Sequence, residues 1–366
     1  MKWKFYSLAF VAGMSILTAC SSDDNNDNDG NGGNGNGNEI ENGTILKGTI
    51  TSDVTLAAGN TYKLSGEYIV EEGATLHIEE GVKIIAVYDD IADYILVKQG
   101  GKINAVGTPD KPIVMTSEKE EPGAWGGIHI CGRAHTNAEG GKGSSEIGGA
   151  VYGGNDDADN SGTLQYIRLE YTGFAFDEEH EANGISFYGV GNGTIVDHCQ
   201  AYKGSDDGFE FFGGSVNVSN LVAVSCSDDS FDWTEGWNGK GTNLVAYQEA
   251  ESTLGYDCDC LMECDNNGSN NAATPVAHPV LKNLILVGNG GSKQGIRLRA
   301  GTEVEIDNAK VCGKGQPLTV ETALTENALK NGTSKLTNIT LTSELSCKEG
   351  IYTHADFCLL YTSPSP

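Results

Sequence analysis

The sequence has few basic residues. Lys and Arg together number 23 against 51 Asp and Glu, which gives a formal net charge of −28 over 366 residues. Nucleic acids and anionic lipid surfaces attract basic proteins, so this balance argues against both as partners. It suits neutral glycans, cations or basic partners.

A membrane-spanning run is also missing at the N-terminus. The apolar run at residues 5–17 is too short to cross a bilayer. It follows Lys2 and Lys4 and leads into Leu17-Thr18-Ala19-Cys20, so we predict a signal peptide over residues 1–19. A Cys in this setting resembles the lipidated Cys of a bacterial lipobox. We therefore predict that Cys20 is the lipid anchor of an outer-membrane lipoprotein.

Apolar residues are absent from positions 21–38, which contain only Ser, Asp, Asn and Gly. Such a segment cannot offset its chain entropy by burial, so we predict a disordered acidic tether over residues 20–44. Its beginning, Cys20-Ser21-Ser22-Asp23-Asp24, resembles the acidic export signal of Bacteroidota-type surface lipoproteins. That resemblance implies exposure at the cell surface.

No stretch supports a long amphipathic helix, and the dominant pattern is instead a repeat. Ser205-Asp206-Asp207-Gly208-Phe209-Glu210-Phe211 returns 22 residues later as Ser227-Asp228-Asp229-Ser230-Phe231-Asp232-Trp233. Similar segments, apolar and polar in alternation, occur at 184–188, 260–264, 295–299 and 317–321. Alternation is typical of half-buried strands, and a repeat of this length indicates stacked coils.

A second series of strands begins with asparagine. Five asparagines precede apolar residues at matching places: Asn220, Asn243, Asn283, Asn308 and Asn338. Stacked side-chain amides at a tight turn would form an asparagine ladder along the coil axis. The two series together predict an all-β fold, a right-handed parallel β-helix, over residues 45–357.

Two segments depart from the repeat. Residues 132–162 are rich in Gly, Asn and Asp and read as one long surface loop. Residues 358–366 break the pattern of the chain and resemble translated adaptor sequence, so we predict a non-native tail.

Several segments share a resemblance to one family. They are 123–128 (Gly-Ala-Trp-Gly-Gly-Ile), 166–171, 206–214, 231–233 and 263–267. Together they resemble Bacteroidota-type secreted right-handed parallel β-helix lipoproteins, a family of no established activity. The resemblance implies this fold and an exported location, and it leaves the chemistry open.

Alternation in the first series places one set of side chains outward. If Phe209 and Phe211 point inward, the outward set includes Tyr188, Glu210, Phe212, Asp232, Glu263, Arg297 and Arg299. Exposed aromatic rings beside polar groups are one way to bind sugars, so we predict a glycan-binding face here. A solvated outer face without a ligand is the alternative.

The doubled aspartates are the sharpest local signal. Stacked coils would bring Asp206 onto Asp228 and Asp207 onto Asp229, and like charges about 5 Å apart repel by several kcal/mol at an effective dielectric of 20. Relief could come from backbone N–H groups at the turn, from Ca²⁺ held by Asp206, Asp228 and Asp229, or from Arg297 and Arg299. Asp207 and Asp229 suit the first role, because they share a side with the inward Phe residues.

The same four aspartates are candidate catalytic carboxylates. Glycosidases use paired carboxylates, and Asp206-Asp207 with the segment 295–299 faintly resembles β-helix polygalacturonases. The Gly-His-Gly element of those enzymes has no counterpart near Asp228.

We therefore predict a monomeric, surface-exposed, lipid-anchored protein that binds glycan or another extended polymer. A divergent polysaccharide lyase or glycoside hydrolase is the first alternative, and a structural or adhesive module is the second. Cys258, Cys260 and Cys264 are read as inward core residues rather than as a metal site.

Overall fold

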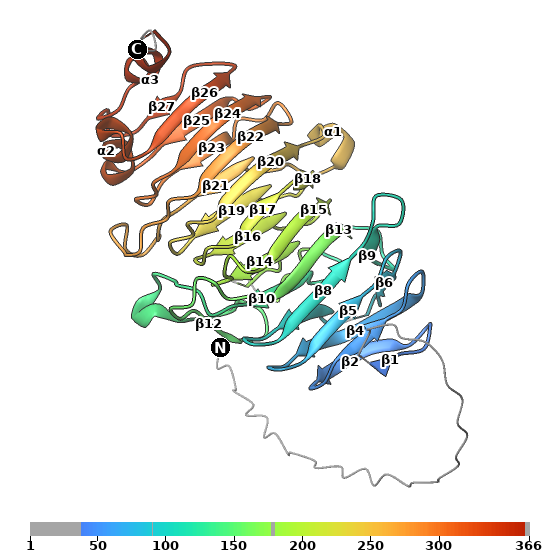
Figure 1. The fold of residues 1–366 in the computed structure, drawn as a ribbon. Coiled ribbons are helices and arrows are strands. Elements are labelled where there is room, and N and C mark those ends of the chain that lie inside the picture. The colour runs from blue at the N-terminus through green and yellow to red at the C-terminus, as the bar shows by residue number, and fades with distance from the viewer. Residues whose placement is uncertain (1–37, 90, 177–179, 363–366) are drawn as a thin grey trace, which may run out of the picture. The chain divides into compact units, whose positions relative to one another are not determined.

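The structure, a computed structural model, describes residues 38–89, 91–176 and 180–362 (Figure 1). The predicted signal peptide, Cys20 and positions 20–37 of the tether lie outside the described residues. Strands pair in parallel from one coil to the next over this body, which confirms the predicted parallel β-helix. Among the described residues, no helix is long and apolar enough to cross a membrane.

In one series of strands, each strand pairs with the strand of the next coil. We call this series the first face. It contains β2 (Ile45–Ile50), β4 (Thr61–Val70), β7 (Tyr94–Val97), β10 (Ile128–Cys131), β14 (Ile185–Tyr188), β16 (Phe209–Phe212), β19 (Phe231–Thr234), β21 (Met262–Cys264), β23 (Gln294–Leu298), β25 (Gln316–Val320) and β27 (Ser346–Cys347).

The remaining coil strands form two further faces. They are β1 (Asn38–Glu39), β3 (Val54–Leu56), β5 (Thr75–Ile78), β6 (Lys83–Ala86), β8 (Lys102–Val106), β9 (Ile113–Ser117), β13 (Gly162–Glu170), β15 (Ile195–Tyr202), β17 (Asn217–Ser219), β18 (Val222–Val224), β20 (Lys240–Tyr247), β22 (Val280–Val287), β24 (Glu305–Cys312) and β26 (Lys335–Leu341). The long strands of this set bend once, so that each serves both faces.

The inside of the coils is filled by stacked apolar side chains. Phe209 pairs in register with Phe231, and their ring centroids lie 5.6 Å apart. Phe187 stacks on Phe211 at 5.0 Å in the same way. The inward placement predicted for Phe209 and Phe211 is confirmed, because both belong to the buried core. This regular stacking fixes which side chains of the first face must point outward.

The bend between the two further faces is made by single residues with positive φ. Asn220, Asn243, Asn283, Asn308 and Asn338 all lie there, with φ between 54° and 61°. Asn tolerates this left-handed conformation better than most residues. The Asn243 amide donates to Asn220 Oδ1 at 2.9 Å, Asn283 to Asn243 at 3.0 Å, and Asn308 to Asn283 at 2.8 Å. Asn338 instead donates to Asp307 at 2.9 Å.

Residues 132–162 do not run freely over the surface. They contain a short 3-10 turn, η1 (Glu139–Gly141), and an antiparallel pair, β11 (Gly143–Ser144) with β12 (Val151–Tyr152). Ile147 and Tyr152 are buried against the outer side of the first face, in a second apolar cluster with Tyr188 and Phe212. Residues 132–162, which we call the covering segment, therefore cover part of the face that we predicted to be open.

The two ends of the body differ from the predicted boundaries. Asn38 pairs with Val54 and the half-buried Ile40 packs on the core, so residues 38–44 belong to the first coil rather than to a tether. Helix α1 (Glu251–Leu254) is a single turn on a loop, α2 (Ala323–Asn331) lies between β25 and β26, and α3 (His354–Thr362) follows β27. Phe357 of α3, the last residue of the predicted β-helix domain, is buried in the core, and α3 continues to Thr362, inside the segment predicted as a tail.

Candidate functional site

The outward side of the first face carries a row of polar residues in register. We call it the outer row: Ser186, Glu210, Asp232, Glu263, Arg297 and Thr319, one from each successive coil. Three consecutive members are acids. Coil stacking therefore places them side by side, as expected from the doubled segment.

A second row, the corner row, lies at the turn just before these strands. It consists of Asn183, Asp207, Asp229 and Cys260, which are buried. Asn183 Oδ1 accepts the backbone N–H of Asp207 at 3.2 Å, and Asp207 Oδ1 accepts that of Asp229 at 2.8 Å. Asp229 Oδ1 accepts the N–H of Cys260 at 2.6 Å. Each side chain thus supports the backbone of the next coil, as predicted for Asp207 and Asp229.

The first residue of the corner row carries an amide, whereas the next two, Asp207 and Asp229, carry carboxyl groups. Asn183 has an amide nitrogen that donates to Glu210 at 2.5 Å and to Ser186 at 3.0 Å. At the equivalent place in the next coil, Asp207 offers a carboxylate oxygen instead. In the first of these coils an amide donor faces the acid Glu210, whereas in the next coils carboxyl groups face one another.

The result is a pair of overlapping carboxylate groups. In one, oxygens of Asp207, Glu210 and Asp232 lie within 4.8 Å of one another, and in the other, oxygens of Asp229, Asp232 and Glu263 do so. Asp232 belongs to both groups. Its Oδ1 is buried and has no hydrogen-bond partner within the described part of the chain.

Burial and mutual repulsion shift the titration of these acids. Burial raises the pKa of Asp207 well above its ordinary value, and the Asp206 and Asp229 charges raise it further. Burial followed by the Glu263 charge does the same to the pKa of Asp232. Burial also raises the pKa of Asp206 to about 8. These shifts favour protonated carboxyls at neutral pH.

Asp206 and Asp228 occupy the outer edge of the turn. Oxygens of Asp206, Asp207 and Asp228 form a third group within 4.8 Å, and Asp228 is exposed. Of the three predicted metal ligands, Asp206 and Asp228 are thus together. Asp229 lies one position further in and contributes to other groups.

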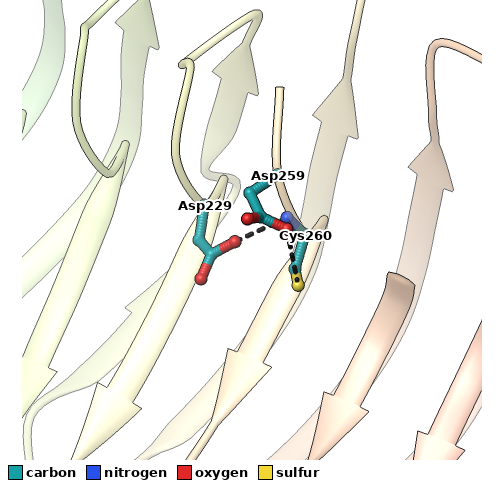
Figure 2. A group of neighbouring side chains, drawn as sticks. All are labelled: Asp229, Asp259 and Cys260. Atoms are coloured by element: carbon teal, nitrogen blue, oxygen red, sulfur yellow. Dashed lines mark hydrogen bonds between the residues drawn. The ribbon is translucent and has the colours of Figure 1, made fainter. Parts of the chain in front are cut away.

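A fourth group contains a thiol. Asp229, Asp259 and Cys260 have ligand atoms within 4.8 Å of one another, and Figure 2 shows the two carboxylates and the sulfur converging. Cys260 Sγ lies 3.4 Å from Asp259 Oδ1. Cys264 is in the core as predicted, whereas Cys260 lies at the corner, because the residue that takes the inward place there is Leu261.

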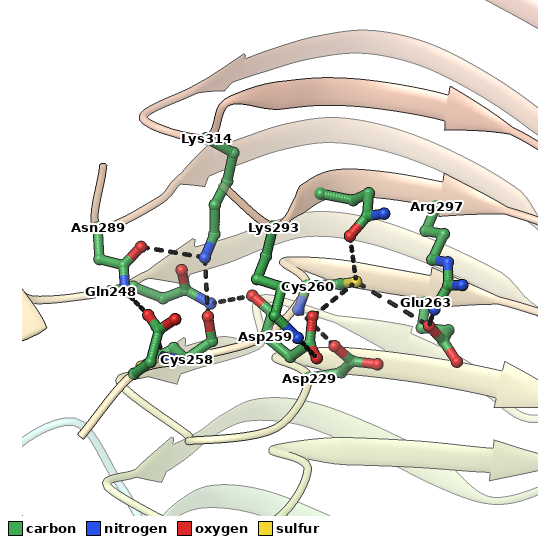
Figure 3. Close-up of polar contacts among 12 residues, drawn as sticks. Asp229, Gln248, Cys258, Asp259, Cys260, Glu263, Asn289, Lys293, Arg297 and Lys314 are labelled. Carbon is green, nitrogen blue, oxygen red and sulfur yellow. Dashed lines mark hydrogen bonds and ion pairs between the residues drawn. The ribbon is translucent and has the colours of Figure 1, made fainter. Parts of the chain in front are cut away.

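The two predicted arginines serve the C-terminal end of the outer row. Arg297 contacts Glu263 at 2.7 Å (Figure 3). It also contacts Glu321 at 3.1 Å, and Arg299 contacts Glu263 at 2.5 Å and Asp265 at 2.7 Å. Neither pairs with the doubled aspartates. The idea that they directly relieve Asp206, Asp207, Asp228 and Asp229 is therefore wrong: Glu263, Asp265 and Glu321 lie closer and take them.

The predicted aromatic platform is also wrong. Tyr188 is 0% exposed and Phe212 is 8% exposed. Their rings stack at 4.4 Å, and Tyr152 from the covering segment lies 5.2 Å from Tyr188. These rings hold the segment on the face, and they offer no surface to a sugar.

The covering segment contributes residues that sequence reasoning missed. Glu146 receives a hydrogen bond from the Tyr188 hydroxyl at 3.3 Å, and burial raises its pKa to about 7. Glu235 accepts from Thr136 and Tyr152, both at 2.7 Å. A Gly- and Asn-rich segment hides such contacts, because nothing in its composition indicates what it covers.

A polar groove lies beside the outer row. Its volume is about 690 Å³, and it lies between residues 137–139 of the covering segment and residues 267–270, with Thr234 and Glu235 also in its lining. Asn137 fixes the two walls: its amide donates to Asn266 Oδ1 at 2.8 Å, and its Oδ1 accepts from Asn267 at 3.0 Å. Thr234 of the lining is on the same strand as Asp232, two positions further along β19.

Comparison with known families agrees with this architecture. Residues 48–363 match the family described as pectate-lyase like beta helix domain. The chain belongs to this family. A search of curated proteins found none that matches it significantly. Membership in the pectate-lyase-like β-helix family is compatible with a polysaccharide-related function and names no substrate.

Proposed function

We propose that this chain binds an extended polysaccharide in the polar groove and across the adjoining outer row. The observation that carries the proposal is the polar groove itself, whose lining includes Thr234, two positions along β19 from Asp232 of the carboxylate groups. Its lining of Asn, Ser, Thr and Glu side chains suits sugar hydroxyls, which both donate and accept hydrogen bonds. The family assignment supports a polymer of sugars as the ligand.

We further propose that the carboxylates hold Ca²⁺. The residues fit this ion: Asp232 Oδ1 is buried without a partner, and oxygens from Asp207, Glu210, Asp229 and Glu263 lie close to those of Asp232. Calcium takes six to eight oxygen ligands and would supply the positive charge that these acids lack. Bound there, it could also contact the oxygens of a sugar.

The remaining parts of the proposal concern location. Anchoring through Cys20 and display at the outer-membrane surface would place the groove where it meets external polymers. The net negative charge of the chain supports a neutral glycan as the ligand. It is also compatible with a glycan that is bound through a cation. We propose a monomer without a nucleic-acid partner.

The groove is tested by filling it. Ala138→Arg places a long side chain in the groove wall, and Ala323→Arg makes the same change at an exposed position of α2. We expect the wild-type protein and the α2 variant to be retained in gels that contain the cognate polysaccharide, and the groove variant to lose retention by tenfold or more. Equal retention of both variants would exclude the groove, and no retention of any of them in a glycan panel would favour a structural or adhesive module.

Cleavage of the bound polymer is a second candidate, favoured by one observation. Glu146 has a pKa of about 7 and Asp206 one of about 8, so both can carry a proton near neutral pH, as a general acid must. Asp207, Asp228 and Asp229 complete the candidate set. Release of reducing ends or unsaturated sugars that disappears in Glu146→Gln or Asp206→Asn would establish this activity. Binding without any release would exclude it.

A further inference from the structure

Lys314 is a buried lysine that lacks a carboxylate partner. It is 5% exposed and follows β24 in the corner beside Gly313. Its Nζ donates to the backbone oxygen of Cys258 at 2.9 Å and to Asn289 Oδ1 at 3.1 Å (Figure 3). None of the ion pairs within the described residues involves it. A charged amine is costly in such a place, and burial lowers the pKa of Lys314.

Asn289 is held by three neighbours at once. Its Nδ2 donates to Asp257 Oδ1 at 2.8 Å. Its Oδ1 accepts the backbone N–H of Gly291 at 3.0 Å in addition to the Lys314 amine. These bonds fix the carboxamide so that the carbonyl faces the amine and the nitrogen faces the acid. Asp257, Asn289 and Lys314 come from three successive coils.

We propose that Lys314 and Asn289 form a covalent isopeptide bond in the folded protein, with Asp257 assisting. The site contains the four groups that this reaction needs. Lys314 supplies the amine, and Asn289 supplies the carbonyl carbon, which is bonded directly to the oxygen that Nζ already touches. Asp257 lies on the nitrogen that leaves. The Gly291 N–H points at the oxygen on which negative charge develops.

The reaction balances without any other reagent. The neutral Lys314 amine attacks Asn289 Cγ, so an Nζ–Cγ bond forms and the Cγ–Nδ2 bond breaks. The second amine proton ends on the departing Nδ2, which leaves as ammonia, and Asp257, which already accepts a hydrogen bond from Nδ2 at 2.8 Å, is placed to hand a proton to it. Nothing is oxidised or reduced. Holding the reacting groups in contact replaces a bimolecular encounter, which is the usual source of acceleration in such sites.

The bond would join two adjacent coils that already touch through their backbones. The Gly290 N–H donates to the Gly313 oxygen at 2.7 Å, and Gly315 donates to Gly291 at 2.8 Å. No movement of the chain is therefore needed to bring the amine to the carboxamide. The link would close a loop from residue 289 to residue 314 and resist separation of these coils.

Mass spectrometry of the purified full-length protein tests the proposal. After denaturation, trypsin should release residues 283–293 joined to residues 311–330, with the cut after Lys314 missing and a mass about 17 Da below the sum, equal to one ammonia. Lys314→Arg should release the two segments separately, and Asp257→Ala should reduce the linked fraction at least tenfold. Lys310→Arg, a change at an exposed lysine of β24, should leave the link intact.

Two results would overturn it. One is recovery of the 283–293 and 311–314 peptides from the wild-type protein as separate, unmodified species. The other is an ammonia loss confined to a linear 283–293 peptide, because Asn289-Gly290 can also lose ammonia by closing a succinimide on its own backbone. Both readouts use the wild-type protein, so they stay decisive even if a variant fails to fold.

Discussion

Asp207 Oδ1 accepts the backbone N–H of Asp229 at 2.8 Å, so a side chain of one coil supports the main chain of the next. Asn183 makes the same contact to Asp207 at 3.2 Å, and Asp229 makes it to Cys260 at 2.6 Å. An amide and a carboxylate are thus interchangeable as acceptors at this corner. Only the carboxylates bring charge to the outer row.

The first prediction separates the acceptor from the charge. Asp207→Asn keeps an Oδ1 for the Asp229 N–H and removes an acid that burial forces to take up a proton on folding, so in chelator at pH 7.5 we expect the free energy of unfolding to rise by about 1 kcal/mol. Asp207→Ala leaves that buried N–H without an acceptor and should lower it by about 1–3 kcal/mol. Urea unfolding measures both. Equal losses in the two variants would contradict this account.

Calcium should act on the same residues. In millimolar Ca²⁺ we expect the melting temperature of the wild-type protein to rise by several degrees and to return with chelator, because an ion that binds only the folded state stabilises it. Asp232→Asn should lose most of this rise. Asp110→Asn, at an exposed site away from the outer row, is the matched control. An unchanged wild-type melting temperature would rule out the metal.

Asp93 allows a simpler test of how stability depends on pH. Asp93 is 1% exposed; its Oδ1 accepts the Gly66 N–H at 2.5 Å and its Oδ2 has no partner within the described chain. Burial raises its pKa to about 6. The folded state therefore holds this proton more tightly than the unfolded state, and stability falls as the pH rises from about 4 through 6.

Asp93→Asn should remove that loss. The shift corresponds to about 3 kcal/mol between the two ends of the window. We expect the wild-type protein to be the more pH-sensitive of the two by roughly this amount, measured by urea unfolding at pH 4 and pH 7. Parallel pH profiles for the two proteins would show that Asp93 does not titrate in this range.

Glu326 of α2 anchors the C-terminal end. The carboxylate is 0% exposed and accepts the backbone N–H groups of Glu349 and Ile351 at 2.6 Å and of Tyr352 at 3.1 Å. Glu326→Ala should therefore lower the free energy of unfolding by about 3 kcal/mol, since three donors lose a charged acceptor. Glu344→Ala, at an exposed position, should have little effect. A loss equal to that of the control would mean that water replaces the carboxylate.

Local pattern made much of the coil architecture predictable. Strict alternation placed Phe209 and Phe211 inward, and the asparagines fell at the bend because it needs positive φ. The covering of Tyr188 and Phe212 could not be predicted in this way. It depends on Ile147 and Tyr152, two apolar residues scattered in a polar segment, whose partners are distant in the sequence.

The register of the outer row also could not be predicted from local pattern alone. The segment from β19 to β21, which contains β20 and α1, is longer than in the basic repeat, and the pairing of Asp232 with Glu263 also brings Asp265 beside Arg299. Alternation with Cys260, Met262 and Cys264 inward predicts Leu261 for the outward place that Glu263 takes, and Glu263 for the place that Asp265 takes. Loop length sets the phase of each strand, and sequence spacing alone does not reveal where the extra residues bulge out.

The contact between Asn137 and Asn266 bears on the order of assembly. These residues are 129 positions apart, and the hydrogen bonds between them hold the covering segment to a loop several coils further along. The coils can stack one after another as the chain emerges, because each pairs with its neighbour. The covering segment must wait until residues beyond 266 have taken their place. The groove can thus form only after residues 267–270 are in place, and a chain truncated before that point would build the earlier coils and lack the site.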